Sequence, residues 1–176
     1  PIAGSELVAN FENQAKNLGT QIESDSIEEI TKNEDGAFTL KGTLTIPDGV
    51  TAIGNYAFYN CTNLSSVTLP ASVTSISGTA FSGCSDLVSI NVPAGNSNYS
   101  SANGFLLNSN GTALICCPEG KNSLTIPETV TSIGDLAFNG CTGLTSITFP
   151  DEIESIDNYA FYGCTGLTNI VIQGNV

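Results

Sequence analysis

The sequence repeats one pattern of residues every 23 positions, and this period limits the available folds more than any other feature. A full unit, Leu64 to Cys84, reads Leu-x-x-Val-x-Leu-Pro-x-x-Val-x-x-Ile-x-x-x-Ala-Phe-x-x-Cys. Periods of about 20 to 50 residues are typical of solenoids, whose units pack only against their neighbours and build a broad surface. Eight of these positions return in three further units: Leu44, Ile46, Pro47, Val50, Ile53, Ala57, Phe58 and Cys61; Leu124, Ile126, Pro127, Val130, Ile133, Ala137, Phe138 and Cys141; Ile147, Phe149, Pro150, Ile153, Ile156, Ala160, Phe161 and Cys164.

Each unit is expected to hold one short strand followed by a helical return. The stretch Val67-Thr-Leu69 alternates apolar and polar residues, the period of a strand with one buried face. Pro70 has no N–H to donate and ends the strand. The spacing from Ile53 to Cys61 predicts a short helix or 3₁₀ turn that packs Phe58 inward. Its counterparts are predicted to stack likewise: Phe81, Phe138 and Phe161.

The unit resembles the BspA-like type of bacterial leucine-rich repeat, whose hallmark is an Ile-Pro step followed by Ala-Phe and Cys. The resemblance covers residues 44 to 172. It implies an α/β solenoid, a right-handed superhelix with short strands and short helical or 3₁₀ turns. The classical leucine-rich repeat has an asparagine ladder after its strand, which this chain lacks, because the matching positions are Gly49, Ser72, Thr129 and Glu152.

The repeat array is predicted to span residues 44–176, with an irregular unit at 93–123. Residues 96–104 read as a loop, and Asn110-Gly111 is a strong hairpin signal between Phe105–Leu107 and Ala113–Cys117. We expect this hairpin to replace the helical side of one coil. The insertion is either a structural variant that extends the sheet or a binding loop, since loops both tolerate insertions and carry function.

Residues 1–43 are predicted to form an N-terminal cap made of a helix and a hairpin. Leu7, Phe11, Ala15 and Leu18 lie on one face of an amphipathic helix, and the turn signal at 33–36 indicates a hairpin. A first coil needs such a cover for its apolar edge.

The other end of the array begins a new strand, Ile170-Val-Ile172, without a polar cap. Terminal repeats normally need covering. Either the polypeptide continues, or the last strand pairs with a second copy, so the chain is expected to be a monomer or a weak dimer through this end.

The charge of the chain excludes several classes of partner. Four Lys, no Arg and 17 acidic residues give a net charge of −13, which argues against nucleic acid and anionic membranes. No stretch is long and apolar enough to insert into a membrane. The sequence holds no export signal, and a location outside the cell or on the bacterial surface is implied only by the family resemblance.

The sequence offers no catalytic residue, cofactor site or metal site. Without any His, every His-based triad is excluded. Four cysteines share one repeat position and are predicted to be buried free thiols, whereas Cys116 and Cys117 alternate faces of a strand, so one of them is expected to be a reactive surface thiol. The densest acidic group is either a solvated corner or a weak calcium site: Asp151, Glu152, Glu154 and Asp157.

The predicted function is protein binding by a non-enzymatic, exported bacterial surface protein. Resemblance to BspA-like proteins implies adhesion to host extracellular-matrix or mucosal proteins. The low-charge outer strand face also suits a structural spacer or stalk, while exposed tyrosines beside a carboxylate would suit a carbohydrate-binding module. The candidate contact residues are Asn96, Asn98 and Tyr99 in the irregular unit, and Tyr159 and Tyr162 near Asp157.

Overall fold

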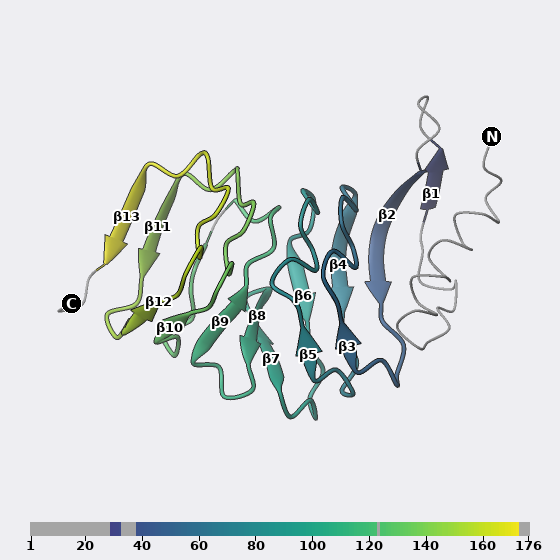
Figure 1. Cartoon of the computed structure of the whole chain (residues 1–176), viewed down its shortest axis with the longest axis horizontal. Helices are drawn as coiled ribbons and strands as arrows, with labels where there is room; N and C mark the ends of the chain where they lie inside the picture. The colour runs from purple at the N-terminus through teal and green to yellow at the C-terminus, as the bar shows by residue number, and fades with distance from the viewer. Residues whose placement is uncertain (1–28, 33–37, 123, 173–176) are drawn as a thin grey trace.

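The chain winds into a β-solenoid of about six turns, with its coils stacked along the long axis of the molecule (Figure 1). The structure, a computed structural model, describes residues 29–32, 38–122 and 124–172. Two rows of parallel strands run along the stack, and the bounds of the strands are as follows. The first row holds β2 (Phe38–Thr45), β4 (Leu64–Thr68), β6 (Ser89–Asn91), β11 (Ser146–Phe149) and β13 (Asn169–Ile172); the second holds β3 (Ala52–Ile53), β5 (Ser75–Ile76), β10 (Ser132–Ile133) and β12 (Ser155–Ile156).

Neighbouring strands of each row pair one repeat apart. Val67 lies opposite Ile90 in the first row, and Ile53 lies opposite Ile76 in the second. The 23-residue period therefore sets the register directly. The prediction of one strand per coil is wrong in two respects: each regular coil carries a second, two-residue strand after its proline, and the Leu124–Ile126 stretch has no strand.

The predicted helical returns are wrong, because these segments are chains of turns, and no helix occurs among the described residues. Alternate N–H groups close turns within the coil, as from Tyr59 N to Tyr56 O at 3.1 Å. The N–H groups between them donate to the next coil, from Phe58 N to Ala80 O at 2.8 Å. In a helix every N–H beyond the first turn donates within the same segment, so this alternation excludes a helix here.

The phenylalanines of the turns do stack as predicted. The rings of Phe58 and Phe81 lie 5.3 Å apart with 5° between their planes, and those of Phe138 and Phe161 lie 5.1 Å apart at 13°. Such pairs stabilise a fold by about 0.5–1.5 kcal/mol beyond the area they bury.

The irregular unit adds three strands: β7 (Tyr99–Ala102), β8 (Phe105–Asn108) and β9 (Ala113–Cys116). The predicted hairpin is confirmed, since β8 pairs antiparallel with β9. The prediction of a loop at 96–104 is wrong for β7, which pairs antiparallel with β8. The sheet runs β12-β10-β9-β8-β7, so the unit lies in the second strand row and not on the turn side of a coil (Figure 1).

The hydrophobic core consists of two clusters that meet at β8. Leu106 belongs to the cluster built from residues 44–92, whereas Phe105 and Leu107 belong to the cluster built from residues 105–160. All three side chains are almost fully buried. Strand β8 is therefore covered on both faces and joins the two halves of the array.

At the N-terminal side, β1 (Glu29–Lys32) pairs antiparallel with β2, which continues past residue 43 into the first coil. The predicted helix over residues 7–18 lies outside the described residues, so the helix and hairpin cap as a whole is not supported. The described ranges contain no helix that could cross a membrane.

Candidate functional site

The most exposed aromatic side chains of the described array are two pairs of tyrosines on the turn segments. Tyr56 and Tyr59 lie in the first coil, with ring centroids 5.5 Å apart and planes at 82°. Tyr159 and Tyr162 lie in the last described coil, at 6.3 Å and 79°. The four residues are 56%, 58%, 71% and 64% exposed, respectively. The same edge-to-face arrangement is thus present near both ends of the array.

The local backbone explains why these tyrosines face solvent. In the run Tyr-Ala-Phe-Tyr, the phenylalanine turns inward to join the stack, and the flanking tyrosines are left outside. Tyr56 and Tyr159 have φ angles of 56° and 53°. A left-handed conformation is uncommon for a bulky residue and costs of the order of 1 kcal/mol or more. The fold therefore holds the first tyrosine of each pair in a strained conformation.

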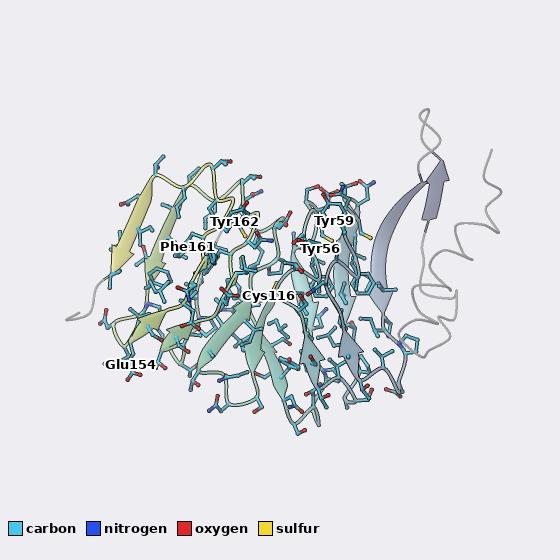
Figure 2. All side chains as sticks on the ribbon, in the orientation of Figure 1. Tyr56, Tyr59, Cys116, Glu154, Phe161 and Tyr162 are labelled. Atoms are coloured by element: carbon cyan, nitrogen blue, oxygen red, sulfur yellow. The ribbon has the colours of Figure 1, made fainter. Side chains whose placement is uncertain are left out.

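The coils between the two pairs carry small polar residues at most of the matching positions. Thr79 and Ser82 occupy them in one coil, and Leu136 and Asn139 in the next regular coil. The Asn139 side-chain amide donates to Ser82 Oγ at 2.8 Å, so these two coils touch directly on the turn side. Figure 2 shows Tyr56, Tyr59 and Tyr162 in the upper half of the view, with Glu154 at the lower edge.

The predicted contact residues of the irregular unit make mostly structural contacts. The Asn96 amide donates to Pro70 O and Val73 O at 3.1 and 3.0 Å, and its Oδ1 accepts from the backbone N–H of Asn98 and Tyr99. The Tyr99 hydroxyl accepts from Ile76 N at 3.1 Å, and its ring packs against the N-terminal core cluster.

Asn98 is the one exposed member of this group, and its Oδ1 accepts from Ser97 Oγ at 3.0 Å. The structure therefore does not bring Asn96, Asn98 and Tyr99 together as one outward-facing surface. A contact role for them stays a prediction.

The acidic corner does not form a metal site. Asp151, Glu152, Glu154 and Asp157 are all exposed, and no group of three or more potential ligands that could hold a metal occurs within the described ranges. The interpretation of this corner as a weak calcium site is therefore wrong.

All six cysteines are free thiols, which confirms that prediction for the four at the shared repeat position, although only two of those four are buried. Cys84 and Cys164 each donate at 3.0 Å to a phenylalanine carbonyl of an earlier coil, Phe58 O and Phe138 O. Cys84 and Cys141 are buried, whereas Cys61 and Cys164, in the outer coils, are half-buried.

The prediction of a reactive surface thiol is wrong. Cys117 is buried, and Cys116 packs against the N-terminal core cluster. Burial raises the pKa of Cys116 to about 12, so the thiolate is scarce at neutral pH.

Glu119 joins the two halves of the array on the turn side. Its Oε1 accepts from Gly83 N at 2.8 Å, and its carboxylate also lies beside Gly140. Burial raises the pKa of Glu119, although the hydrogen bond from Gly83 opposes that shift. The neighbouring cavity, lined by Ser82, Cys116 and Asn139 among others, has a volume of about 10 Å³. It has room for one water molecule and not for a substrate.

The sequence matches the family described as BspA type Leucine rich repeat region in six copies, over residues 34–120 and 113–176. The chain therefore belongs to the BspA-type leucine-rich repeat family. Members of this class are repeat scaffolds, and the match indicates no catalytic family. No curated protein matches the chain.

Among solved structures, the chain is similar to a leucine-rich repeat protein from Eubacterium ventriosum, with 27% identity and a TM-score of 0.59 over 75% of this chain and 42% of that one. It also shares its fold with the pneumococcal vaccine antigen PcpA, with 21% identity and a TM-score of 0.56 over 76% of this chain and 39% of that one. The chain spans about two fifths of the length of these two proteins.

The sequence predicted contact residues at Tyr159 and Tyr162 but not at Tyr56 and Tyr59. Tyr56 and Tyr59 occupy the same repeat positions as Tyr159 and Tyr162, and this coincidence was visible in the alignment of the units. The stacking geometry that makes the two pairs equivalent was not.

Proposed function

We propose that this chain is a non-catalytic binding module of a bacterial surface protein, and that it holds protein ligands such as host extracellular-matrix or mucosal proteins. Membership of the BspA-type family supports a role in protein contact at the cell surface. The observation that carries the proposal is the pair of exposed tyrosines at each end of the turn side.

Tyrosine is a suitable anchor for such contacts. Its ring offers a large rigid apolar area, its hydroxyl can both donate and accept, and tyrosines are enriched among the residues that dominate interface energies. Four of the five tyrosines of the chain lie in the two pairs, and each is more than half exposed. Side chains this exposed add little to the stability of the hydrophobic core.

The test is direct binding of the purified chain to immobilised fibronectin, fibrinogen, laminin and mucin. A double variant, Tyr59→Ser with Tyr162→Asn, places at each position a residue that another coil of this array already carries, Ser82 and Asn139. It should therefore keep the fold, which circular dichroism checks. We expect saturable binding by the natural chain and a loss of at least about tenfold in the variant, since each anchor contributes on the order of 1–2 kcal/mol.

The irregular unit is a second proposed contact surface, in which Asn98 is the exposed candidate residue. Asn98→Ala should weaken binding if this segment touches the ligand. Tyr99→Ala is a poor probe, because it removes a ring that packs on the core. Equal affinity of the Asn98→Ala variant and the natural chain would remove the segment from the site.

A structural spacer is the alternative function, and the outer face of the first strand row favours it. There Ser89 Oγ donates to Ser66 Oγ at 2.9 Å and the Asn91 amide donates to the same atom at 3.0 Å. These small polar side chains satisfy one another and present no anchor. Binding to none of the four proteins would favour the spacer function.

Self-association through the last described coil is also proposed. Ile170 and Ile172 of β13 are 46% and 41% exposed. Light scattering over a wide concentration range should show a weak rise in mass, and a constant monomer mass would rule this association out.

A further inference from the structure

We infer that the two tyrosine pairs contact uncharged sugar rings of a glycosylated ligand, an inference that rests on the proposed function and names the part of the ligand that is held. Both pairs present tyrosine rings to solvent. Thr79 and Ser82 lie between the pairs, and Asn55 and Asn158 each precede the first tyrosine of a pair.

The chemistry of these neighbours matches a sugar better than a polypeptide interface. A pyranose ring has an apolar face of C–H groups and a rim of hydroxyls. An aromatic ring covers the apolar face, and nearby amide and hydroxyl side chains exchange hydrogen bonds with the rim. In a protein interface the anchor instead lies in a fully buried and largely apolar centre of the contact. Leu136 is the one aliphatic residue at the matching positions of the inner coils.

The charges of the chain restrict the sugars to uncharged ones. A sulfated, uronic or sialic sugar needs a cation to offset the loss of its hydration. The chain has four Lys and no Arg, and Lys121, the one basic residue from residue 44 onward, lies with its Nζ 5.0 Å from the centre of the Phe105 ring. Asp135 and Asp157 beside the turn segments add negative charge. Anionic glycans are therefore repelled from this edge.

The distance between the pairs allows one ligand to touch both. Tyr59, Ser82, Asn139 and Tyr162 hold the same repeat position, and the hydrogen bond from Asn139 to Ser82 joins the two inner coils directly. The pairs therefore lie three coil steps apart: the two outer steps are backbone-paired at about 4.8 Å each, and the middle step is bridged by side chains. A multivalent ligand that reaches both pairs gains effective concentration for the second contact. A densely glycosylated protein meets that requirement.

The experiment compares the chain on three forms of purified immobilised mucin: untreated, freed of sialic acid, and stripped of all glycans. We expect equal or tighter binding after removal of sialic acid, and a loss of about tenfold or more after complete removal of the glycans. Binding that persists on the stripped protein would overturn the sugar assignment and leave the proposed function standing. Binding to none of the three forms would overturn both for this ligand, and loss on removal of sialic acid alone would overturn the uncharged class.

A solution measurement gives an independent readout. The chain has no Trp, and four of its five Tyr lie in the pairs, so tyrosine fluorescence reports mainly on the site. Neutral oligosaccharides released from the mucin should change this fluorescence in a saturable way. Tyr59→Ser and Tyr162→Asn should each weaken binding to intact mucin and together abolish it, while Val88→Ser, a change at a 47% exposed apolar residue away from the pairs, should leave it unchanged. A Val88→Ser effect as large as that of the tyrosine changes would overturn the placement of the site.

Discussion

The regular coils and the irregular unit bury the same kinds of side chain in different ways. In a regular coil, Val67 packs beside Ile90, its equivalent one repeat away, and both face a single core. In the irregular unit, consecutive residues of β8 face two cores, because Leu106 packs into one and Phe105 and Leu107 into the other. The repeat decides where a side chain points only as long as the period continues. Where it is interrupted, one short strand supports both halves.

The largest test of this difference is truncation of the β8 side chains. Phe105→Ala should lower the free energy of unfolding by about 3–5 kcal/mol and Leu106→Ala by about 2–5 kcal/mol. In hydrogen exchange, Leu106→Ala should loosen residues 44–92 more, and Phe105→Ala should loosen residues 124–160 more. Leu69→Ala, in a regular coil, is the matched control and should loosen its own half. Identical exchange patterns for the two β8 variants would show that the cores are not separate.

A second test concerns the seam between the two halves on the turn side. Gly140 has a φ of +73°, and a Cβ there would meet the Glu119 carboxylate. Gly140→Ala should therefore destabilise the chain by about 1–2 kcal/mol. Gly54→Ala is the control, since a Cβ at Gly54 meets nothing within 4 Å. Equal urea midpoints for the two variants would mean that Glu119 does not close this seam.

The hydroxyl of Tyr99 offers a smaller test of how the irregular unit attaches to its neighbour. Tyr99→Phe keeps the packed ring but removes the acceptor for Ile76 N. The expected cost is about 1 kcal/mol, because the N–H is only partly buried and water can replace the bond in part. Thermal unfolding compares it with Tyr59→Phe, whose hydroxyl is exposed. A cost no larger than that of the control would leave the bond without a role in stability.

The smallest expected effect is a change in the pH dependence of stability when Glu119 is replaced. The pKa of Glu119 is raised above its ordinary value of 4.5 in the folded chain, chiefly by burial. The folded state then binds the proton more tightly than the unfolded state, so the contribution of this group is fully present below the unfolded pKa. It is lost as the pH rises through the folded pKa.

Glu119→Gln keeps an oxygen that accepts from Gly83 N and has no charge to bury. The variant should therefore be more stable than the natural chain at neutral pH, and the difference should shrink as the pH falls toward the unfolded pKa. Urea unfolding over this range measures it. A gap that widens toward acid would show that the carboxylate is stabilised as an anion, with the opposite sign of shift.

The sequence predicted the regular part of the fold well, because the period carries both the register of the strands and the stacking of the phenylalanines. It failed at the turns: the helical spacing from Ile53 to Cys61 is real, but the N–H groups of Phe58 and Asn60 bond to the next coil. The spacing of residues alone cannot show whether an N–H group donates within its own coil or to the next coil. The loop prediction around Tyr99 was wrong for a similar reason. The polar composition there is typical of a loop, but the Tyr99 hydroxyl and the Asn96 amide form hydrogen bonds to the backbone of the array.

The backbone N–H groups around the inward-facing phenylalanines of two turn segments donate to the coil that follows. Phe58 N donates to Ala80 O, and Phe138 N donates to Ala160 O. At these positions each coil therefore offers N–H groups to the coil that follows it and carbonyl groups to the coil before it, so the two faces of a coil are unlike. If two copies meet through their last coils by a two-fold axis, donors face donors along the turns. Head-to-tail contact is the arrangement that pairs these donors with acceptors, so association through these turn positions favours a row of molecules over a two-fold dimer.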